Sequence, residues 1–346
     1  MTVTNRVLGV SRSARVKLDQ TVDAATAKIA KAWAAAWDEV TDEWREALLE
    51  LASMADDDGW PARYAALRVR RAQVAIEHTA EQLDRLSQQA GVTIVRTVPD
   101  TISMGEDVTQ RLAALQLPRS GAGVSWTRLN PRAIDWMITR TTQQIESTLW
   151  PLSQDAQAVM RQTLLRGVIV GDNPRDAADL MLTRLRGDFN GGLARAENIA
   201  RTELLDSLRY AALESRRENR DVLAGWRWTC TYNARTCGAC LAMDGQVFDL
   251  DTPGPYGHQS CRCVAVPVPK SWADLGFPGM REPADDTKTG REWFDEQPER
   301  TQVGILGRKR LDALRSGRLT WDDIPQVRQN PNWRPSVVVA PLDAAV

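Results

Sequence analysis

The sequence contains very little histidine and few cysteines, and each scarcity excludes a class of protein. Its 346 residues include two histidines, His78 and His258, and five cysteines. Neither histidine is followed two positions later by the glutamate that a zinc-dependent deaminase requires, so that chemistry is excluded. The first residues show no apolar leader, and five cysteines without one favour a metal site or reactive thiols over a disulfide framework.

Long apolar runs and net charge are also absent. No stretch approaches the roughly 18–20 apolar residues of a membrane span, so we expect a soluble protein made in the cytoplasm with no membrane partner. Lys and Arg total 44 against 45 Asp and Glu, and a net charge of −1 gives no overall attraction to nucleic acid. Nucleic-acid binding would need a local basic patch, and the run at 308–310 is read as a solvated helix face.

Helical spacing dominates the N-terminal part of the chain. We expect one helix from Thr21 to Met54 and a second from Pro61 to Ala90, which Gly91 ends, followed by an extended piece around Pro99. Two long helices joined by a short break predict an antiparallel hairpin. The residues expected to face inward are Trp33, Trp37, Val40, Trp44, Leu48 and Leu51 in the first helix, and Leu67, Val74, Leu83 and Leu86 in the second.

The later sequence predicts more helices and then a change in residue composition. Helices are expected over 106–117, 131–149, 151–170, 174–186 and 192–220, with a Gly/Ser/Pro-rich linker over 117–131. From Leu223 onward β-branched and aromatic residues alternate with turn signals, and a helical segment follows. The predicted fold class is mainly α with a small β-rich zinc-knuckle module (α+β). The predicted domains are a helical arm or hairpin (1–120), a helical body (121–222), the Cys/His module with its distal helix (223–325) and a loosely held tail (326–346).

Four of the five cysteines and one histidine fall within 27 residues. Cys237-x-x-Cys240 forms one close pair, and His258-x-x-Cys261-x-Cys263 forms a second group. Zinc takes four nitrogen or sulfur ligands in a tetrahedron, and two close-spaced pairs supply them. We therefore predict one structural zinc ion, bound by Cys237, Cys240 and His258 together with either Cys261 or Cys263, in a closed site.

Alternatives to a structural zinc ion stay open for the cysteine cluster. A thioredoxin-like redox pair would place the CxxC at the start of a helix in a βαβ unit, whereas the flanks here look turn-like. A Cys–His nucleophile would need a third orienting group that the sequence does not identify. The thiols could also be reduced and packed without metal. Cys230 lies outside the cluster and is read as a small buried residue.

The order of the motifs resembles a known family. An Ala-Arg-Thr-Glu helix and a Trp strand precede the Cys/His cluster, and a "QP…ILG" helix follows it. Over about residues 160–325, this order resembles the head morphogenesis, or Mu F-like minor capsid, family of tailed bacteriophages. The segments that carry the resemblance are 200–203, Trp226 or Trp228, 236–240, Asp244-Gly245, 258–263, 297–298 and 305–307.

The resemblance implies a role in the virion rather than catalysis. Such proteins look like minor components of the capsid interior, and the implied partners are the portal protein, the major capsid or scaffolding protein, and packaged DNA. No catalytic residue is assigned, and we expect no fused C-terminal enzyme or toxin. Two alternatives stay open: a zinc- or thiol-dependent enzyme (a nuclease or transferase using Arg201, Glu203 and His258, or a redox protein using the CxxC), and a DNA-binding module.

Overall fold

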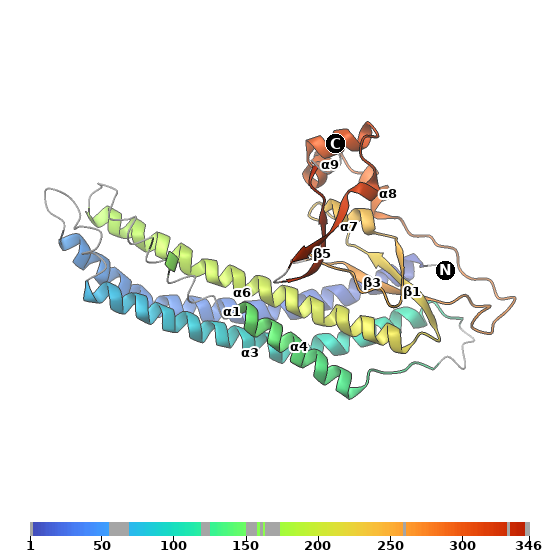
Figure 1. The fold of residues 1–346 in the computed structure, drawn as a ribbon, viewed down its shortest axis with the longest axis horizontal. Helices are drawn as coiled ribbons and strands as arrows, with labels where there is room; N and C mark the ends of the chain where they lie inside the picture. Colours follow the sequence, from blue (N-terminus) through green and yellow to red (C-terminus); the bar gives the residue numbers. More distant parts are fainter. Residues whose placement is uncertain are drawn as a thin grey trace. The chain divides into compact units, whose positions relative to one another are not determined.

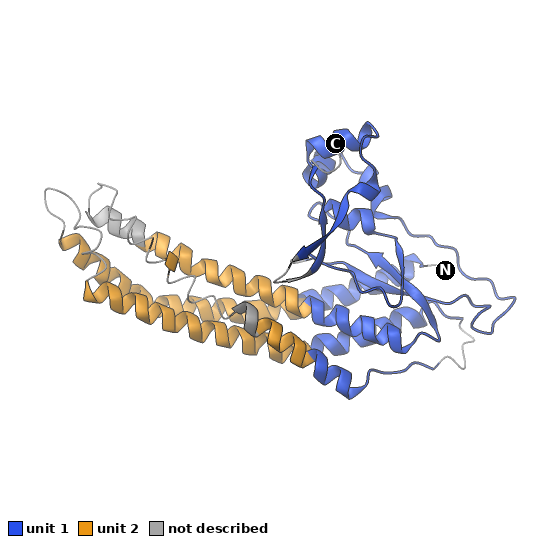
Figure 2. Ribbon diagram, in the orientation of Figure 1, with its two compact units in different colours: residues 1–19, 99–137, 205–346 blue, residues 20–98, 138–204 orange. Residues whose placement is uncertain are grey.

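The described residues of the computed structural model form two compact units (Figure 2). The structure describes residues 3–54, 69–118, 125–149, 158, 159, 162, 174–258, 261–330 and 333–342. Unit 1 comprises Met1–Asp19, Pro99–Met137 and Leu205–Val346, and unit 2 comprises Gln20–Val98 and Ile138–Leu204. The chain is mostly helical with small antiparallel sheets and a cysteine-rich cluster, which confirms the predicted α+β class. The predicted domain boundaries stay predictions.

Unit 2 contains most of two long helices, α1 (Asn5–Ser53) and α3 (Arg70–Ala114), which lie side by side (Figure 1). Residues 5–19 of α1 and 99–114 of α3 belong to unit 1. As positions rise along α1 their partners fall along α3, so the two helices are antiparallel. The partners are Glu39 with Gln82, Glu43 with His78, and Glu46 with Arg71. The predicted hairpin of long helices therefore forms, although α1 begins 16 residues earlier than expected, at Asn5 rather than Thr21.

Tryptophans fill the core of unit 2. The whole predicted stripe of α1, from Trp33 to Leu51, is buried. Trp33 donates its indole N–H to the carbonyl of Phe189 on α6 (Pro174–Glu218), and Trp44 donates to the hydroxyl of Thr79 at 2.8 Å. Large aromatic rings whose N–H groups are satisfied give this unit an apolar core of its own.

The prediction that Gly91 ends the second helix, with an extended piece after it, is wrong. Helix α3 runs without interruption to Ala114 and contains Pro99. An apolar stripe at helical spacing continues through both expected breaks, and it consists of Leu83, Leu86, Ala90, Ile94, Val98 and Ile102, all buried. Burial of that stripe outweighs the roughly 3–4 kcal/mol by which one Gly and one Pro disfavour a helix interior.

The register of α3 also corrects one predicted core residue. Val74 is 47% exposed, because the buried face of α3 passes through Ala72, Ala75 and Ile76 instead.

Leu67 and most of the predicted helix over 151–170 lie outside the described residues. Helix α4 (Pro131–Leu149) has the predicted bounds, whereas the two helices predicted over 174–186 and 192–220 form the single helix α6.

The β-rich part of unit 1 contains a three-stranded antiparallel sheet. Strand β1 (Leu223–Thr229) lies between β2 (Val247–Asp249) and β3 (Val264–Pro269). The short helix α7 (Gly238–Met243) connects β1 to β2 through the predicted turn at Asp244-Gly245, where Gly245 has φ +88°. Val266 and Val268 of β3 pack against the first turns of α1 and the end of α3.

The C-terminal part of unit 1 is ordered around the same core. Three short helices, α8 (Gly290–Asp295), α9 (Glu299–Leu306) and α10 (Arg308–Arg315), precede the 3₁₀ turn η1 (Trp321–Asp323). Strands β4 (Pro325–Asn330) and β5 (Trp333–Val339) then form an antiparallel hairpin. The sequence predicts a loosely held tail here, and that prediction is wrong for the hairpin, because Val337 is buried in the core that contains the cysteine cluster.

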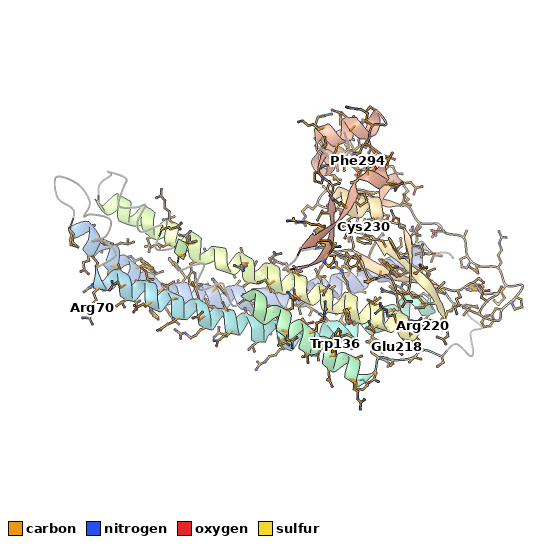
Figure 3. All side chains as sticks on the ribbon, in the orientation of Figure 1. Arg70, Trp136, Glu218, Arg220, Cys230 and Phe294 are labelled. Carbon is orange, nitrogen blue, oxygen red and sulfur yellow. The ribbon has the colours of Figure 1, made fainter. Side chains whose placement is uncertain are left out.

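Figure 3 places Cys230 and Phe294 within this β-rich part and Trp136 on α4. Trp136 is 53% exposed and its ring lies 5.4 Å from that of Tyr210 on α6. Within the described residues, no helix combines the length and the apolar character needed to cross a membrane.

Candidate metal centre

The first cysteine pair lies at the start of helix α7. Cys237 is the N-cap residue, and its sulfur accepts a hydrogen bond from the backbone N–H of Cys240 at 3.4 Å. The flanks of the CxxC are therefore helical on one side, which corrects the turn-like reading of the sequence. The strands around it are antiparallel, so the βαβ unit of a thioredoxin-like redox site is not formed by β1, β2 and β3.

The structure brings the second group of the motif next to the first. His258 Nε2 lies 3.2 Å from the sulfur of Cys237 and 3.6 Å from that of Cys240, and the sulfurs of Cys240 and Cys261 are 3.8 Å apart. Ligand atoms on a tetrahedral zinc with Zn–S bonds of about 2.3 Å are ~3.8 Å apart. The observed spacing therefore suits a small ion bound between these atoms.

All five predicted ligands belong to two overlapping groups that could hold a metal ion. Cys237, Cys240 and His258 form one group, and Cys240, Cys261 and Cys263 form the other, with all ligand atoms of each group within 4.8 Å of one another. Cys240 belongs to both. The choice between Cys261 and Cys263 as fourth ligand stays a prediction. Both precede β3 rather than lying within it.

Hydrogen bonds inside the cluster divide the thiols into acceptors and donors. The hydrogen bond from Cys240, with His258 as a second donor, lowers the pKa of Cys237 to about 5 against the effect of burial. The hydrogen bonds from Cys240 and Cys263 likewise lower the pKa of Cys261, and the pKa of Cys240 is raised because its proton is shared with these acceptors. Two thiolates are thus favoured within the cluster, and thiolate is the form that binds metal.

Cys230 is buried outside both groups, as the sequence predicts. Its backbone N–H donates to a carboxylate oxygen of Asp244 at 2.7 Å, and burial raises the pKa of its thiol. The same carboxylate group accepts the hydroxyl of Tyr232. Asp244 is therefore more than the turn former that the sequence indicates, because it holds the chain between β1 and the CxxC.

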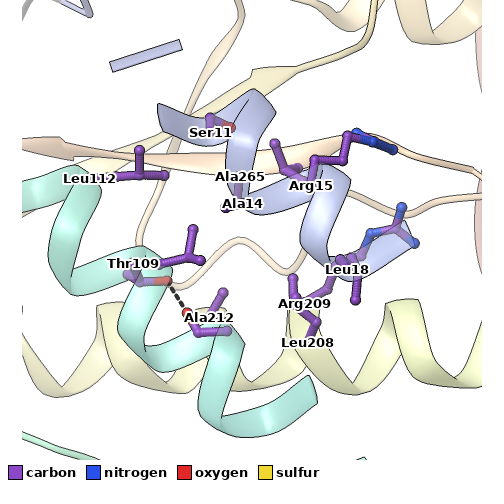
Figure 4. A pocket seen from close by; sticks show the side chains of 13 residues that line it. Ser11, Ala14, Arg15, Leu18, Thr109, Leu112, Leu208, Arg209, Ala212 and Ala265 are labelled. Atoms are coloured by element: carbon purple, nitrogen blue, oxygen red, sulfur yellow. Dashed lines mark hydrogen bonds between the residues drawn. The ribbon is translucent and has the colours of Figure 1, made fainter. Parts of the chain in front are cut away.

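Two buried arginines beside the cluster were not predicted. Arg209 on α6 donates from Nε and Nη2 to the carbonyl of Cys263 at 3.1 and 3.0 Å, and from Nη2 to the carbonyl of Cys261. Arg15 on α1 interacts electrostatically with Asp19 and Cys263, while burial lowers its pKa. Both arginines line a small cavity of about 30 Å³ (Figure 4). Their charges offset those of the thiolates.

A signal for Arg209 exists in the sequence. Leu205 and Ala212 lie on the buried apolar face of α6, and Arg209 stands between them at helical spacing. An apolar residue would be expected at that position. A buried charge needs a partner, and here the partners are backbone carbonyls from a segment more than 50 residues away.

One side of the cluster is accessible from a surface pocket. It lines a pocket of about 290 Å³ together with Thr231, Asn233, Arg235 and Arg262, and both Cys237 and His258 are only half-buried. A closed coordination shell, filled by four protein ligands, stays a prediction. Arg262 is also 3.6 Å from Asp19.

The fold and site define a mostly helical protein with a small β module built around a Cys/His cluster that could hold a metal ion. Residues 158–266 match the family model described as Phage Mu protein F like protein, and this supports assigning the chain to the Mu F-like head morphogenesis family. The matched segment contains Arg209 and all five candidate ligands. No curated protein and no solved structure matches the chain significantly.

Proposed function

We propose that this chain is a minor component of a tailed-phage head, located in the capsid interior beside the portal. It acts in head assembly or in DNA packaging and delivery, with the portal, the major capsid protein or the scaffolding protein as partner. The observation that carries the proposal is the family match, which spans the whole of helix α6 and the whole Cys/His cluster. The long helices of unit 2 offer the extended surface that a larger partner needs.

Zinc is the metal that we propose for the cluster, in a structural role. The candidate ligands are soft thiolates and one imidazole at tetrahedral spacing, which suits zinc better than magnesium or calcium. Cys237, Cys240 and His258 would bind it with Cys261 or Cys263. The ion would join α7 to the segment before β3, and such cross-links stabilise modules whose strands are short.

The experiment that tests the location is quantitative mass spectrometry of purified particles of the phage or induced prophage that encodes this chain. We expect a few copies per particle, which co-isolate with the portal after mild disruption. Absence from both particles and proheads, with abundant protein in the lysate, would overturn the proposal.

A thiol-redox function is the second candidate, because one observation favours it. Cys237 caps a helix, and its pKa of about 5 is low enough to give a nucleophilic thiolate at neutral pH. Chelation separates the two candidates. A structural metal predicts that a chelator destabilises the β module, whereas a redox pair predicts an unchanged fold and a reversible disulfide between Cys237 and Cys240.

A further inference from the structure

A groove between α1 and α3, within unit 2, carries positive charge on its rim. Its volume is about 450 Å³. Three long cationic side chains line it, Lys28 from α1 and Arg85 and Arg96 from α3, and all three are exposed. The amides of Gln88 and Gln89 lie on the same α3 surface. These groups donate hydrogen bonds of the kind that phosphate oxygens accept.

No carboxylate is among the residues that line the groove. Carboxylates are absent from residues 24–37 of α1 and from residues 85–99 of α3. The nearest ones along the helices, Asp23, Asp38, Asp84 and Asp100, do not line the groove. Among described residues, Lys28, Arg85 and Arg96 make no ion pair. The groove is thus a local basic surface on a chain whose net charge is −1.

The spacing of these cations suits a repeating anion. Arg85 and Arg96 are eleven residues apart on one helix, which corresponds to ~16 Å at about 1.5 Å per residue. One DNA strand presents a phosphate about every 3.4 Å of helix axis, so about five phosphates fall within that length. A single small anion would contact one end of the groove only.

We propose that this groove binds the phosphate backbone of double-stranded DNA without reading its sequence. The choice of DNA over an acidic protein segment rests on the proposed function, which locates the chain beside a packaged genome. The contact would be electrostatic and salt-dependent, because each cation that neutralises a phosphate releases a condensed counterion.

The test is fluorescence anisotropy of the full-length protein with a labelled DNA duplex of ~30 base pairs and arbitrary sequence, at salt concentrations from about 50 to 200 mM. The variant carries Lys28→Gln, Arg85→Gln and Arg96→Gln, since glutamine has a helix propensity close to those of lysine and arginine. We expect binding at least tenfold weaker at about 50 mM salt, and a log–log salt slope smaller by roughly 2–3, since each lost phosphate contact removes about 0.9.

The matched control removes the same charge elsewhere, through Arg132→Gln, Arg281→Gln and Arg300→Gln, three exposed positions outside the groove. It should bind DNA as the unchanged protein does. Equal loss in the two variants, or no loss in the groove variant, would overturn the proposal. The proposal would also be overturned if the protein bound polyglutamate through the groove but did not bind DNA. Because the assay uses purified protein, its failure is independent of whether the chain is found in particles.

Discussion

Arg209 connects helix α6 to the backbone that carries the last two cysteines. Its guanidinium bonds to the carbonyls of Cys261 and Cys263, and no apolar side chain can replace those bonds. We expect Arg209→Met to weaken metal binding by about 10–100-fold, as removal of groups that orient metal ligands typically does. Competition with a chromophoric chelator measures this affinity. Arg220→Met, at an exposed position, is the control, and an equal affinity for the two variants would contradict the assigned role.

The candidate cysteine ligands can be tested one at a time. Cys240 belongs to both candidate groups, so Cys240→Ser should abolish stoichiometric metal binding. Cys230→Ser should keep one metal ion per chain, because Cys230 lies outside both groups. Metal content by mass spectrometry of the purified variants decides this. Of the variants Cys261→Ser and Cys263→Ser, the one that loses metal identifies the fourth ligand. If the Cys240→Ser variant retained its metal ion, the cluster would not be the metal site.

At the scale of single residues, the sequence predicts the candidate ligands, because their positions follow from short-range spacing. Cys237, Cys240, His258, Cys261 and Cys263 come together as their short-range pattern indicates. The position of Arg209 among apolar residues is a sequence signal for a buried charge, but its partners are main-chain carbonyls, which no sequence pattern marks.

Among the elements, α3 and α6 approach each other closely at Gly105. A methyl group there would lie 2.5 Å from the carbonyl oxygen of Leu208 and 3.0 Å from the side chain of Ala211. We expect Gly105→Ala to lower the free energy of unfolding by about 1–3 kcal/mol, as overpacking does. In a unit of about 200 residues this corresponds to roughly 2–4 °C in melting temperature per kcal/mol.

Gly9 of α1 supplies the matched control for that substitution. Nothing lies within 4 Å of a methyl group at that position, so Gly9→Ala should raise stability by about 0.5–1 kcal/mol through helix propensity alone. Thermal denaturation of both variants tests the contrast. The same sign of change in the two would refute the close approach of α3 and α6.

The C-terminal hairpin gives a second contrast between paired residues. Val337 of β5 is 3% exposed, whereas Val327, its partner on β4, is 49% exposed. Val337→Asp buries an unpaired charge and should cost about 3–5 kcal/mol, while Val327→Asp should cost less than about 1 kcal/mol. Urea unfolding followed by tryptophan fluorescence measures both. A tail that is only loosely held would give two small effects.

Elements are predicted well where the pattern within one segment decides and poorly where packing decides. The apolar stripe from Trp33 to Leu51 identifies α1, and the change in residue composition at Leu223 identifies β1. Gly91 and Pro99 misled the prediction for α3, because their local preference for a break is overcome by burial against other helices. The β4–β5 hairpin is missed for the same reason, since Val337 is buried against residues that are distant in the sequence.

At the scale of the whole molecule, the two units should respond differently to loss of metal. Cys240, Cys261 and Cys263 belong to the hydrophobic core of the β-rich part of unit 1, so removing an ion leaves ionisable thiols inside that core. Unit 2 has a core of its own, formed by Trp33, Trp37 and Phe189. Hydrogen exchange before and after adding a chelator therefore distinguishes the units.

We expect chelation to speed exchange at the amides of β1, α7 and β3 by at least tenfold, with residues 20–53 and 70–98 unchanged. Adding back zinc in excess should restore the protection. Equal acceleration in both units would mean that the chain unfolds as one body, and no acceleration anywhere would mean that the thiols pack without a structural ion. The selective result is expected because a bound metal stabilises only the state whose ligands it joins, and the five candidate ligands all lie in unit 1.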